Sequence, residues 1–193
     1  STTTWVMNNH DVPRSPSRYG LPQVKGAPFH QLAHDWLLRD GGTYPEDREV
    51  GARRARAAAL MEIGLPGSVY VYQGEELGLF EVANIPWDRL EDPTPCNTRR
   101  NFTDKGRDGC RVPLPWVAAD APKLDDPDDE FGHDGSFGFS PADATAEPHL
   151  PQPAWYKDFA VDVESADPDS MLNLYRRVLA LRHDMQTTDL SVE

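Results

Sequence analysis

The chain has 193 residues, 38% of them hydrophobic, with 32 acidic and 19 basic side chains and a formal net charge of −13. This length predicts one domain or two small ones with enough apolar side chains for a core. The acidic balance excludes nucleic acid as the main partner, because phosphate binding needs clustered Lys and Arg. No apolar run approaches the ~20 residues of a membrane span and no signal segment opens the chain, so we expect a soluble, cytoplasmic protein without a membrane partner.

One strand and two helices are predicted in the first third of the chain. Residues 2–7 (TTTWVM) are β-branched and aromatic, which is typical of a short buried strand. Residues 29–38 place apolar side chains at helical spacing and predict a short helix. Pro45 and the acids that follow it favour the start of a longer helix, which contains the good helix formers between Ala55 and Ala59 and ends at Gly64.

A second strand and a final helix are predicted further along. Residues 68–72 (SVYVY) form a continuous apolar run, as expected for a strand buried on both faces of a parallel sheet. Residues 170–183 place Leu, Tyr and Val side chains at helical spacing. The alternation of strands and helices predicts a parallel α/β architecture. Two such units cannot close a sheet, and a complete (β/α)8 barrel needs roughly 250 residues, so we predict a fragment of a larger fold.

Most of the net charge lies in one segment. Residues 120–169 contain 14 acids and 2 bases, are rich in Pro and Gly, and show neither helical nor alternating periodicity. They predict a long acidic loop between regular elements, which we bound at residues 117–169. The string DDPDDEFGHDG within it departs from the EF-hand pattern, because Phe131 replaces the required Gly and Phe137 replaces the final Glu. We expect a solvated loop rather than a calcium site.

Cys96 and Cys110 are the only cysteines in the sequence. Two cysteines exclude a disulfide-rich scaffold and a four-cysteine zinc site. The sequence allows either one loop-closing disulfide or two separate thiols, and both interpretations stay open.

Polar residues follow each predicted strand at the point where it ends. The first strand is followed by Asn9-His10-Asp11, Arg14 and Arg18, and the second by Gln73-Gly74-Glu75-Glu76. In parallel α/β proteins the loops after the strands meet at one face, where active sites form. Acids placed there can carry paired-carboxylate catalysis. The alternative is that they cap loops and form salt bridges with the arginines.

A third polar cluster follows later in the chain. The string GRDGCR places Arg107 and Arg111 on either side of Asp108, before the rigid run VPLPW that ends at Trp116. Guanidinium groups and a flat aromatic ring together suit a sugar, because the nitrogens donate to hydroxyls and the ring packs against the apolar face of the pyranose. A structural ion-pair hub is the alternative that composition leaves open.

Two further histidines have the spacing of metal ligands. His30 and His34 are four residues apart on a predicted helix. With His10-Asp11 and His183-Asp184 they raise the hypothesis of a metal-dependent HD phosphohydrolase. That fold carries its His-Asp pair on helices, whereas His10-Asp11 follows a strand. A histidine pair without an acid on the same face is more often ordinary surface, so we disfavour this hypothesis.

Three strings in the chain resemble one known family. WVMNNHDVPRSPSRYG resembles the fourth conserved region of glycoside hydrolase family 13, the α-amylase family. LPGSVYVYQGEELGL resembles the eighth barrel strand of the family's α-glucosidase and oligo-1,6-glucosidase branch, and GRDGCRVPLPW resembles the GRDxxRTPMQW loop of that branch. Three motifs in this order, spread over essentially the whole chain, are highly specific for the family.

The resemblance implies a retaining α-glucosidase-type hydrolase on a (β/α)8 TIM barrel, acting on short α-linked glucosides of the maltose and isomaltose class. Asp11 matches the catalytic carboxylate that stabilises the positively charged transition state. His10 matches the histidine that bonds the same sugar hydroxyls, while Glu75, Glu76 and Arg107 border the subsite of the leaving sugar. The substrate-binding residues that we predict are His10, Arg14, Arg18, Glu75, Glu76, Arg107 and Arg111, with no metal ligand.

The resemblance also implies what this chain lacks. The family's nucleophilic Asp and general-acid Glu lie on strands before the one that opens this chain, and retaining hydrolysis needs both, about 5 Å apart. We therefore predict that residues 1–193 are the last quarter of the barrel, strands 7 and 8 with their helices, and that the isolated chain is inactive. No cofactor is predicted, and a calcium site of a full-length protein would lie outside these residues. The expected partners are an oligosaccharide or disaccharide substrate and the rest of the barrel, or a second copy of the chain.

Two alternatives stay open. One is a transglucosylase of the same family, of the trehalose synthase or sucrose-acting type, because linkage preference and the choice between hydrolysis and transfer depend on motifs upstream. The other is a catalytically silent relative, since the family's fold also serves as a non-enzymatic subunit of membrane transporters. The retention of Asp11 with His10 and the arginines favours the enzyme.

Overall fold

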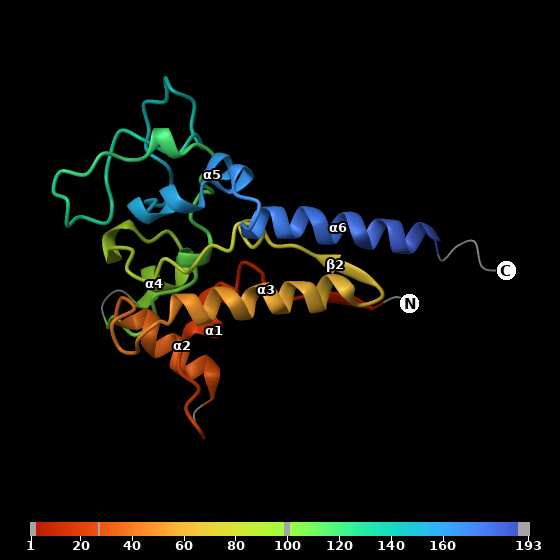
Figure 1. Ribbon diagram of the computed structural model, residues 1–193. Coiled ribbons are helices and arrows are strands. Elements are labelled where there is room, and N and C mark those ends of the chain that lie inside the picture. The colour runs from red at the N-terminus through yellow and green to blue at the C-terminus, as the bar shows by residue number, and fades with distance from the viewer. Residues whose placement is uncertain (1–2, 27, 99–100, 189–193) are drawn as a thin grey trace.

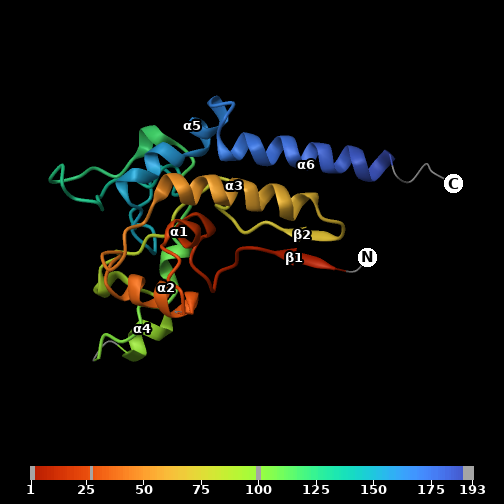
Figure 2. The same cartoon turned by 60° about the horizontal axis from the view of Figure 1, so that its bottom comes forward.

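A parallel pair of strands and two long helices form the frame of the computed structural model, which describes residues 3–26, 28–98 and 101–188 (Figure 1). Strand β1 (Thr4–Val6) pairs with β2 (Ser68–Tyr70), with Trp5 opposite Val69. Helix α3 (Arg48–Gly64) precedes β2 and lies with α6 (Met171–Thr188) on one side of the strand pair (Figure 2). The parallel pairing and the helix between the two strands confirm the predicted α/β architecture.

Shorter elements fill the connections between these four. They are the helices α1 (Ser15–Gly20), α2 (Phe29–Leu38), α4 (Pro93–Thr98) and α5 (Val161–Ala166), and 3-10 turns at Trp87–Arg89, Asp108–Cys110, Ala118–Asp120 and Ala154–Phe159. Helix α2 has the predicted bounds. Sequence periodicity does not predict α1, α4 and α5, because six residues make fewer than two helical turns. Within the described ranges, no helix combines the length and the hydrophobicity needed to cross a lipid bilayer.

Helix α3 begins at Arg48, later than the predicted start at Pro45, because Asp47 caps it. The Asp47 carboxylate accepts the N–H of Val50 at 2.9 Å, and the backbone of Asp47 is extended. This bond satisfies one of the N–H groups that a helix N-terminus leaves without an intrahelical partner. Pro45 therefore lies in the approach to the helix and not in its first turn.

Two glycines let α1 and α3 approach closely. A Cβ at Gly51 would lie 2.2 Å from the carbonyl oxygen of Pro16, and one at Gly20 would lie 2.7 Å from that of Asp47. Both distances are far below van der Waals contact, so only glycine fits at this crossing. The close packing fixes α1, and with it the loop that leaves β1, against the helix that leads into β2.

Helix α6 packs on α3 and closes its C-terminal end. The apolar contact is made by Ala55, Ala59, Ile63, Met171 and Tyr175. Further along α6, the Arg182 guanidinium donates to the carbonyl oxygens of Ile63, Leu65 and Gly67. These groups lie in the last turn of α3 and in the turn to β2, where a helix leaves carbonyl groups without intrahelical partners. Arg182 therefore joins the last helix to the corner between α3 and β2.

The strands are more exposed than the sequence predicts. The run at 68–72 predicts a strand buried on both faces, but Tyr70 is 64% exposed and Val71 40%. Residues 2–7 predict a buried strand, yet Val6 is 52% exposed, and residue 2 lies outside the described ranges. Both predictions are wrong for a simple reason: in the part of the chain that the structure describes, the sheet has two strands and its helices cover one side.

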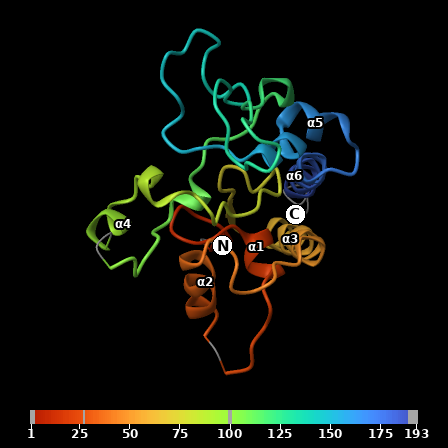
Figure 3. The same ribbon diagram turned by 90° about the vertical axis from the view of Figure 1, so that its left-hand side faces the viewer.

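The acidic segment, residues 117–169, carries part of a core. It is irregular over most of its length, as predicted, and lies at the top of the molecule in Figure 3. Phe137, Leu150 and Tyr156 are nevertheless buried, in one cluster with Leu77 and Leu79 of the stretch after β2. The prediction of a fully solvated loop is therefore corrected: its aromatic and aliphatic side chains cover the residues that follow β2.

Candidate active site

The loops that follow β1 and β2 meet at one end of the molecule. Both strands run toward the end at which α1, α2 and α4 gather (Figure 2). The third polar cluster packs between the two loops. Arg14, after β1, and Tyr72, after β2, both donate to the carbonyl oxygen of Cys110, at 2.8 and 3.0 Å. The structure therefore brings together the three clusters that the sequence predicts.

Asn8 positions the turn that carries Asp11. Asn8 is buried; its Oδ1 accepts the N–H of Ser15 at 2.9 Å, and its Nδ2 donates to the Ser15 hydroxyl at 3.2 Å. Arg18 donates to the same Oδ1 at 3.2 Å and to the carbonyl oxygen of Met7 at 2.6 Å. These bonds tie the end of β1 to α1 on both sides of the turn.

The Asp11 carboxylate faces two guanidinium groups and an imidazole. Its Oδ1 accepts Nη1 of Arg107 at 2.6 Å and lies 3.4 Å from both Arg111 Nη2 and His10 Nε2. The Asp11 side chain is 50% exposed. Its backbone N–H donates to Asn9 Oδ1 at 2.8 Å, which holds the turn. Four of the predicted site residues thus form one cluster, open to solvent.

A second carboxylate, which sequence reasoning misses, lies beneath the two arginines. Asp92 Oδ2 accepts Arg107 Nε at 2.7 Å and Arg111 Nη1 at 3.2 Å, and its side chain is fully buried. Burial alone raises the pKa of Asp92, but hydrogen bonds from Arg107 and Thr94 outweigh it and lower this pKa from 3.8 to about 2. The available sequence signal is Asp92-Pro-Thr94, typical of an Asx turn, in which the Thr94 N–H donates to Asp92 Oδ1 at 2.8 Å.

Asp108 fixes the turn at Asp92. The buried Asp108 carboxylate accepts the N–H groups of Glu91 and Asp92 on Oδ2, at 2.6 and 2.8 Å. The structural hub that composition left open is therefore confirmed, because Asp108 fixes the turn and both arginines pair with Asp92 and Asp11. Contact of Arg107 and Arg111 with a sugar stays a prediction.

Arg14 is placed differently from the sugar contact that the resemblance implies. It is 2% exposed, and its Nη1 and Nη2 donate to the carbonyl oxygens of Gln73 and Cys110 at 3.0 and 2.8 Å. Its backbone N–H donates to Glu81 Oε2 at 2.8 Å. A buried guanidinium bonded to backbone carbonyls links loops and leaves almost no surface for a sugar. We therefore correct the role of Arg14 from substrate contact to loop positioning.

Glu75 also points inward, and the structure does not bring it into the Asp11 cluster. It is 5% exposed, accepts the O–H of Tyr175 at 2.5 Å and accepts the N–H of Tyr72 at 3.2 Å. Glu76 is half-buried and accepts the N–H of Gly74 at 2.8 Å, and burial raises the pKa of Glu76. The two glutamates thus shape the loop after β2, and their predicted contact with a leaving sugar stays a prediction.

Cys110 is a buried, free thiol within the loop cluster. Burial raises its pKa to about 12, so the thiol stays protonated at neutral pH. Because Cys110 is free, the loop-closing disulfide with Cys96 that the sequence allowed is not formed in this structure.

A pocket of about 290 Å³, here called the α2 pocket, opens beside Asp11. Its walls are the loop after β1 (residues 11–13), Arg18, one face of α2 (Phe29, His30, Ala33, His34 and Leu37), the loop 104–107, Glu81 and Cys110. Lys105 joins two of these walls, because it donates to the Asp40 carboxylate, just after α2, and to the Ala83 carbonyl oxygen at 2.6 Å. The predicted residues Asp11, Arg18 and Arg107 thus share one cavity.

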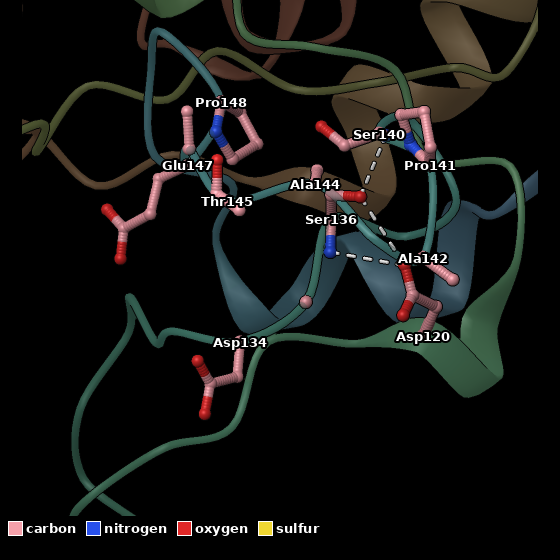
Figure 4. Close-up of a pocket in the computed structure, with 12 residues that line it drawn as sticks. Asp120, Asp134, Ser136, Ser140, Pro141, Ala142, Ala144, Thr145, Glu147 and Pro148 are labelled. Atoms are coloured by element: carbon pink, nitrogen blue, oxygen red, sulfur yellow. Dashed lines mark hydrogen bonds between the residues drawn. The ribbon is translucent and has the colours of Figure 1, made fainter.

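A second pocket, of about 260 Å³, lies in the acidic segment (Figure 4). The Asp120 carboxylate there accepts the N–H and O–H of Ser136 at 3.2 and 3.4 Å, and Asp134 and Glu147 line the same pocket. No predicted site residue lines it. Among residues 3–26, 28–98 and 101–188, no group of three His, Cys, Asp or Glu side chains is arranged to hold a metal ion.

The Asp11 cluster can stabilise positive charge but cannot complete a retaining hydrolysis alone. That reaction needs two carboxyl groups about 5 Å apart, one as nucleophile and one as acid and base. Asp92 is buried against both arginines, and Glu75 and Glu81 are interior. The cluster therefore offers one accessible carboxylate, whose negative charge can stabilise a cationic transition state and which the neighbouring guanidinium groups hold in place.

The chain is similar in sequence to known proteins along most of its length. The sequence profile described as alpha amylase, catalytic domain, matches residues 32–189. A probable alpha-glucosidase of Rhizobium meliloti (strain 1021) is 35% identical over 178 residues, which cover 92% of this chain and 24% of that protein. An oligo-1,6-glucosidase of Parageobacillus thermoglucosidasius is 27% identical over 207 residues, covering 97% of this chain and 29% of that protein.

Solved structures share the fold. The crystal structure of an alpha-glucosyl transfer enzyme superposes with a TM-score of 0.60 at 31% sequence identity, covering 94% of this chain and 25% of that one. The chain therefore spans about a quarter of the length of the proteins that it matches.

Proposed function

Because the chain belongs to the α-amylase family, whose catalytic-domain profile it matches over residues 32–189, we propose that the protein containing it is an α-glucosidase-type glycoside hydrolase acting on short α-linked glucosides. The observation that carries this proposal is the half-exposed Asp11 carboxylate, held against Arg107 and His10 where β1 ends. The similarity to a probable alpha-glucosidase and an oligo-1,6-glucosidase over nearly the whole chain supports the substrate class.

The chain corresponds, in this proposal, to strands 7 and 8 of a (β/α)8 barrel with their helices. The parallel pair of β1 and β2, the helix α3 between them and the helix α6 after β2 support this assignment. The remaining strands of the barrel would then cover the exposed side chains of Val6 and Tyr70.

Asp11 stabilises the positive charge that develops at the anomeric carbon, while the nucleophile and the acid/base come from the rest of the protein. Arg107 and Arg111, fixed from below by Asp92, hold the Asp11 carboxylate in place. His10 and the exposed part of Arg107 donate to sugar hydroxyls. The proposed reaction uses no cofactor.

Glucosyl transfer is the second candidate, and the 31% identity to an alpha-glucosyl transfer enzyme favours it. Retaining hydrolysis and transfer share a glucosyl-enzyme intermediate and differ in whether water or a sugar hydroxyl attacks it. Product analysis at high maltose concentration separates them, because free glucose alone indicates hydrolysis and longer saccharides indicate transfer.

The deciding experiment is an Asp11→Asn substitution in the full-length protein that contains this chain. Loss of the carboxylate charge should lower kcat for p-nitrophenyl α-glucoside by about 10²–10³-fold, with little change in Tm. Asp88→Asn, at an exposed aspartate outside the cluster, is the matched control and should keep wild-type kcat. Wild-type kcat in Asp11→Asn would refute the catalytic role, and a full-length protein without glycosidase or transferase activity would refute the function.

A further inference from the structure

The α2 pocket has the size of a site for one sugar ring. Its volume is about 290 Å³, at the lower limit of the roughly 300–1,000 Å³ that hold drug-sized ligands. Asp11 and Arg107 form part of its wall, so the pocket is continuous with the proposed catalytic site. A ligand with one ring at Asp11 would therefore place its next unit in this pocket.

One face of α2 lines the pocket with unused hydrogen-bonding groups. His30, Ala33, His34 and Leu37 are spaced i, i+3, i+4 and i+7, which puts them on the same side of the helix. Both imidazoles are exposed, and in the described part of the chain neither takes part in a hydrogen bond or an ion pair. Their ring nitrogens are available to a ligand as donor and acceptor.

The rest of the lining combines apolar side chains with charged ones, among them the buried carboxyl group of Glu81. Val12, Pro13 and Phe29 supply apolar surface to the pocket, and the Phe29 ring is of the kind that packs against the apolar face of a pyranose. Glu81 lines the pocket although it is only 3% exposed, and one of its oxygens already accepts the Arg14 N–H. Polar groups that converge on an apolar cavity are typical of small-molecule sites.

The two sides of the pocket are held in fixed relation. Lys105 is 5% exposed and bonds the Asp40 carboxylate, which lies just after α2. Lys105 also lies two residues before Arg107, which contacts Asp11. The face of α2 and the Arg107 loop are therefore positioned before a ligand arrives, which lowers the entropic cost of binding.

We propose that the α2 pocket binds the leaving or accepting sugar, and that His30 and His34 determine which sugar it takes. This inference rests on the proposed function and deepens it, since it assigns residues of α2 to the selection of the second unit. The imidazoles bond hydroxyl groups of that sugar, while Phe29 packs against its ring.

The test compares substrates that differ only in the leaving group, in the full-length protein. His34→Ala and His30→Ala should each lower kcat/KM for maltose by about fivefold to tenfold, the effect of losing one hydrogen bond. The loss should be smaller for α-glucosyl fluoride, because fluoride does not reach the pocket. Gln31→Ala, an exposed residue on the same helix that does not line the pocket, is the matched control and should keep wild-type values for both substrates.

Each other outcome overturns part of the proposal. Equal losses on maltose and α-glucosyl fluoride, or no loss on either, would overturn the role of the histidines. A larger loss on p-nitrophenyl α-glucoside than on maltose would show that the pocket takes an apolar group instead of a sugar. If the wild-type protein turned over none of these substrates, the proposed function would fail. Calorimetric titration with glucose would then test sugar binding by the α2 pocket separately. Binding that is lost in His34→Ala but kept in Gln31→Ala supports the pocket as a sugar site, and absence of binding overturns it.

Discussion

Two arginines connect the buried Asp92 to the half-exposed Asp11, so that a change at one carboxylate reaches the other. Arg107 uses Nε for Asp92 and Nη1 for Asp11, and Arg111 uses Nη1 and Nη2 in the same order. A lysine ammonium has no second, rigidly oriented edge and would not reproduce this bridge. Asp92 is therefore a positioning residue for the carboxylate that the proposed reaction uses.

This arrangement predicts a stability effect that depends on pH. The pKa of Asp92 is lowered from 3.8 to about 2 in the folded chain, so its contribution to stability is complete above 3.8 and is lost as the pH falls through about 2. Asp92→Asn should lower the free energy of unfolding by about 1–3 kcal/mol at neutral pH. The difference in Tm between variant and wild type should shrink as the pH falls toward 2.

The control for this series is Asp88→Asn, at an exposed aspartate close in sequence. Thermal unfolding of the three proteins at several pH values is the measurement. A Tm difference between Asp92→Asn and wild type that stays constant down to pH 2 would mean that the ionised carboxylate is not what stabilises the arginines.

The sequence predicted the exposed half of the site better than the buried half. Asp11, Arg107 and Arg111 stand in short strings of polar residues, and these strings alone were enough to predict them as site residues. Asp92 and the inward direction of Arg14 depend on contacts between loops that lie far apart in the chain: Arg14 bonds a carbonyl 96 residues away. No local pattern carries that information, because the partners are set by how the loops pack.

At the scale of elements, the crossing of α1 and α3 depends on the absence of a Cβ at Gly20 and at Gly51. Gly51→Ala places a Cβ 2.2 Å from the Pro16 carbonyl oxygen, and the backbone there cannot move aside without separating the helices. We expect a loss of about 1–3 kcal/mol in the free energy of unfolding. Gly64→Ala in the same helix is the control: nothing lies within 4 Å of its Cβ, so it should remain within about 1 kcal/mol of wild type.

Denaturant unfolding of both glycine variants measures this difference. If Gly51→Ala were as stable as Gly64→Ala, the tight crossing would not matter to stability. The length of an element decides whether the sequence can predict it. Helices α2, α3 and α6 are long enough for periodicity to show, whereas α1 is fixed by a contact between helices that no period reveals.

At the scale of the whole molecule, the strand pair leaves large apolar side chains exposed to solvent. Val6 and Tyr70 are exposed on β1 and β2, and in the described residues the sheet has no third strand. Strands with exposed edges and apolar side chains associate with one another. The order of strands and helices predicts the parallel pairing. It does not predict the exposure of the strands, because apolar strand sequences are those of a sheet with neighbours on all sides.

The isolated 193-residue chain should therefore self-associate, and Tyr70→Lys should reduce this association. A lysine on the edge adds charge where another strand would dock. Sedimentation velocity at equal concentrations gives the measurement, with Val163→Lys, an exposed apolar residue on α5, as the control. A monomeric wild-type chain, or equal effects of the two lysines, would count against the strand edges as the contact.

Arg182 bonds the Gly67 carbonyl from a position 115 residues later in the chain. On the ribosome, the corner between α3 and β2 emerges long before this partner exists. At about 5–20 residues per second, the delay is on the order of ten seconds. During that interval the three carbonyl groups are hydrated and the nascent corner is accessible to chaperones. The corner between α3 and β2 can therefore reach its final hydrogen bonding only after Arg182 has been synthesised.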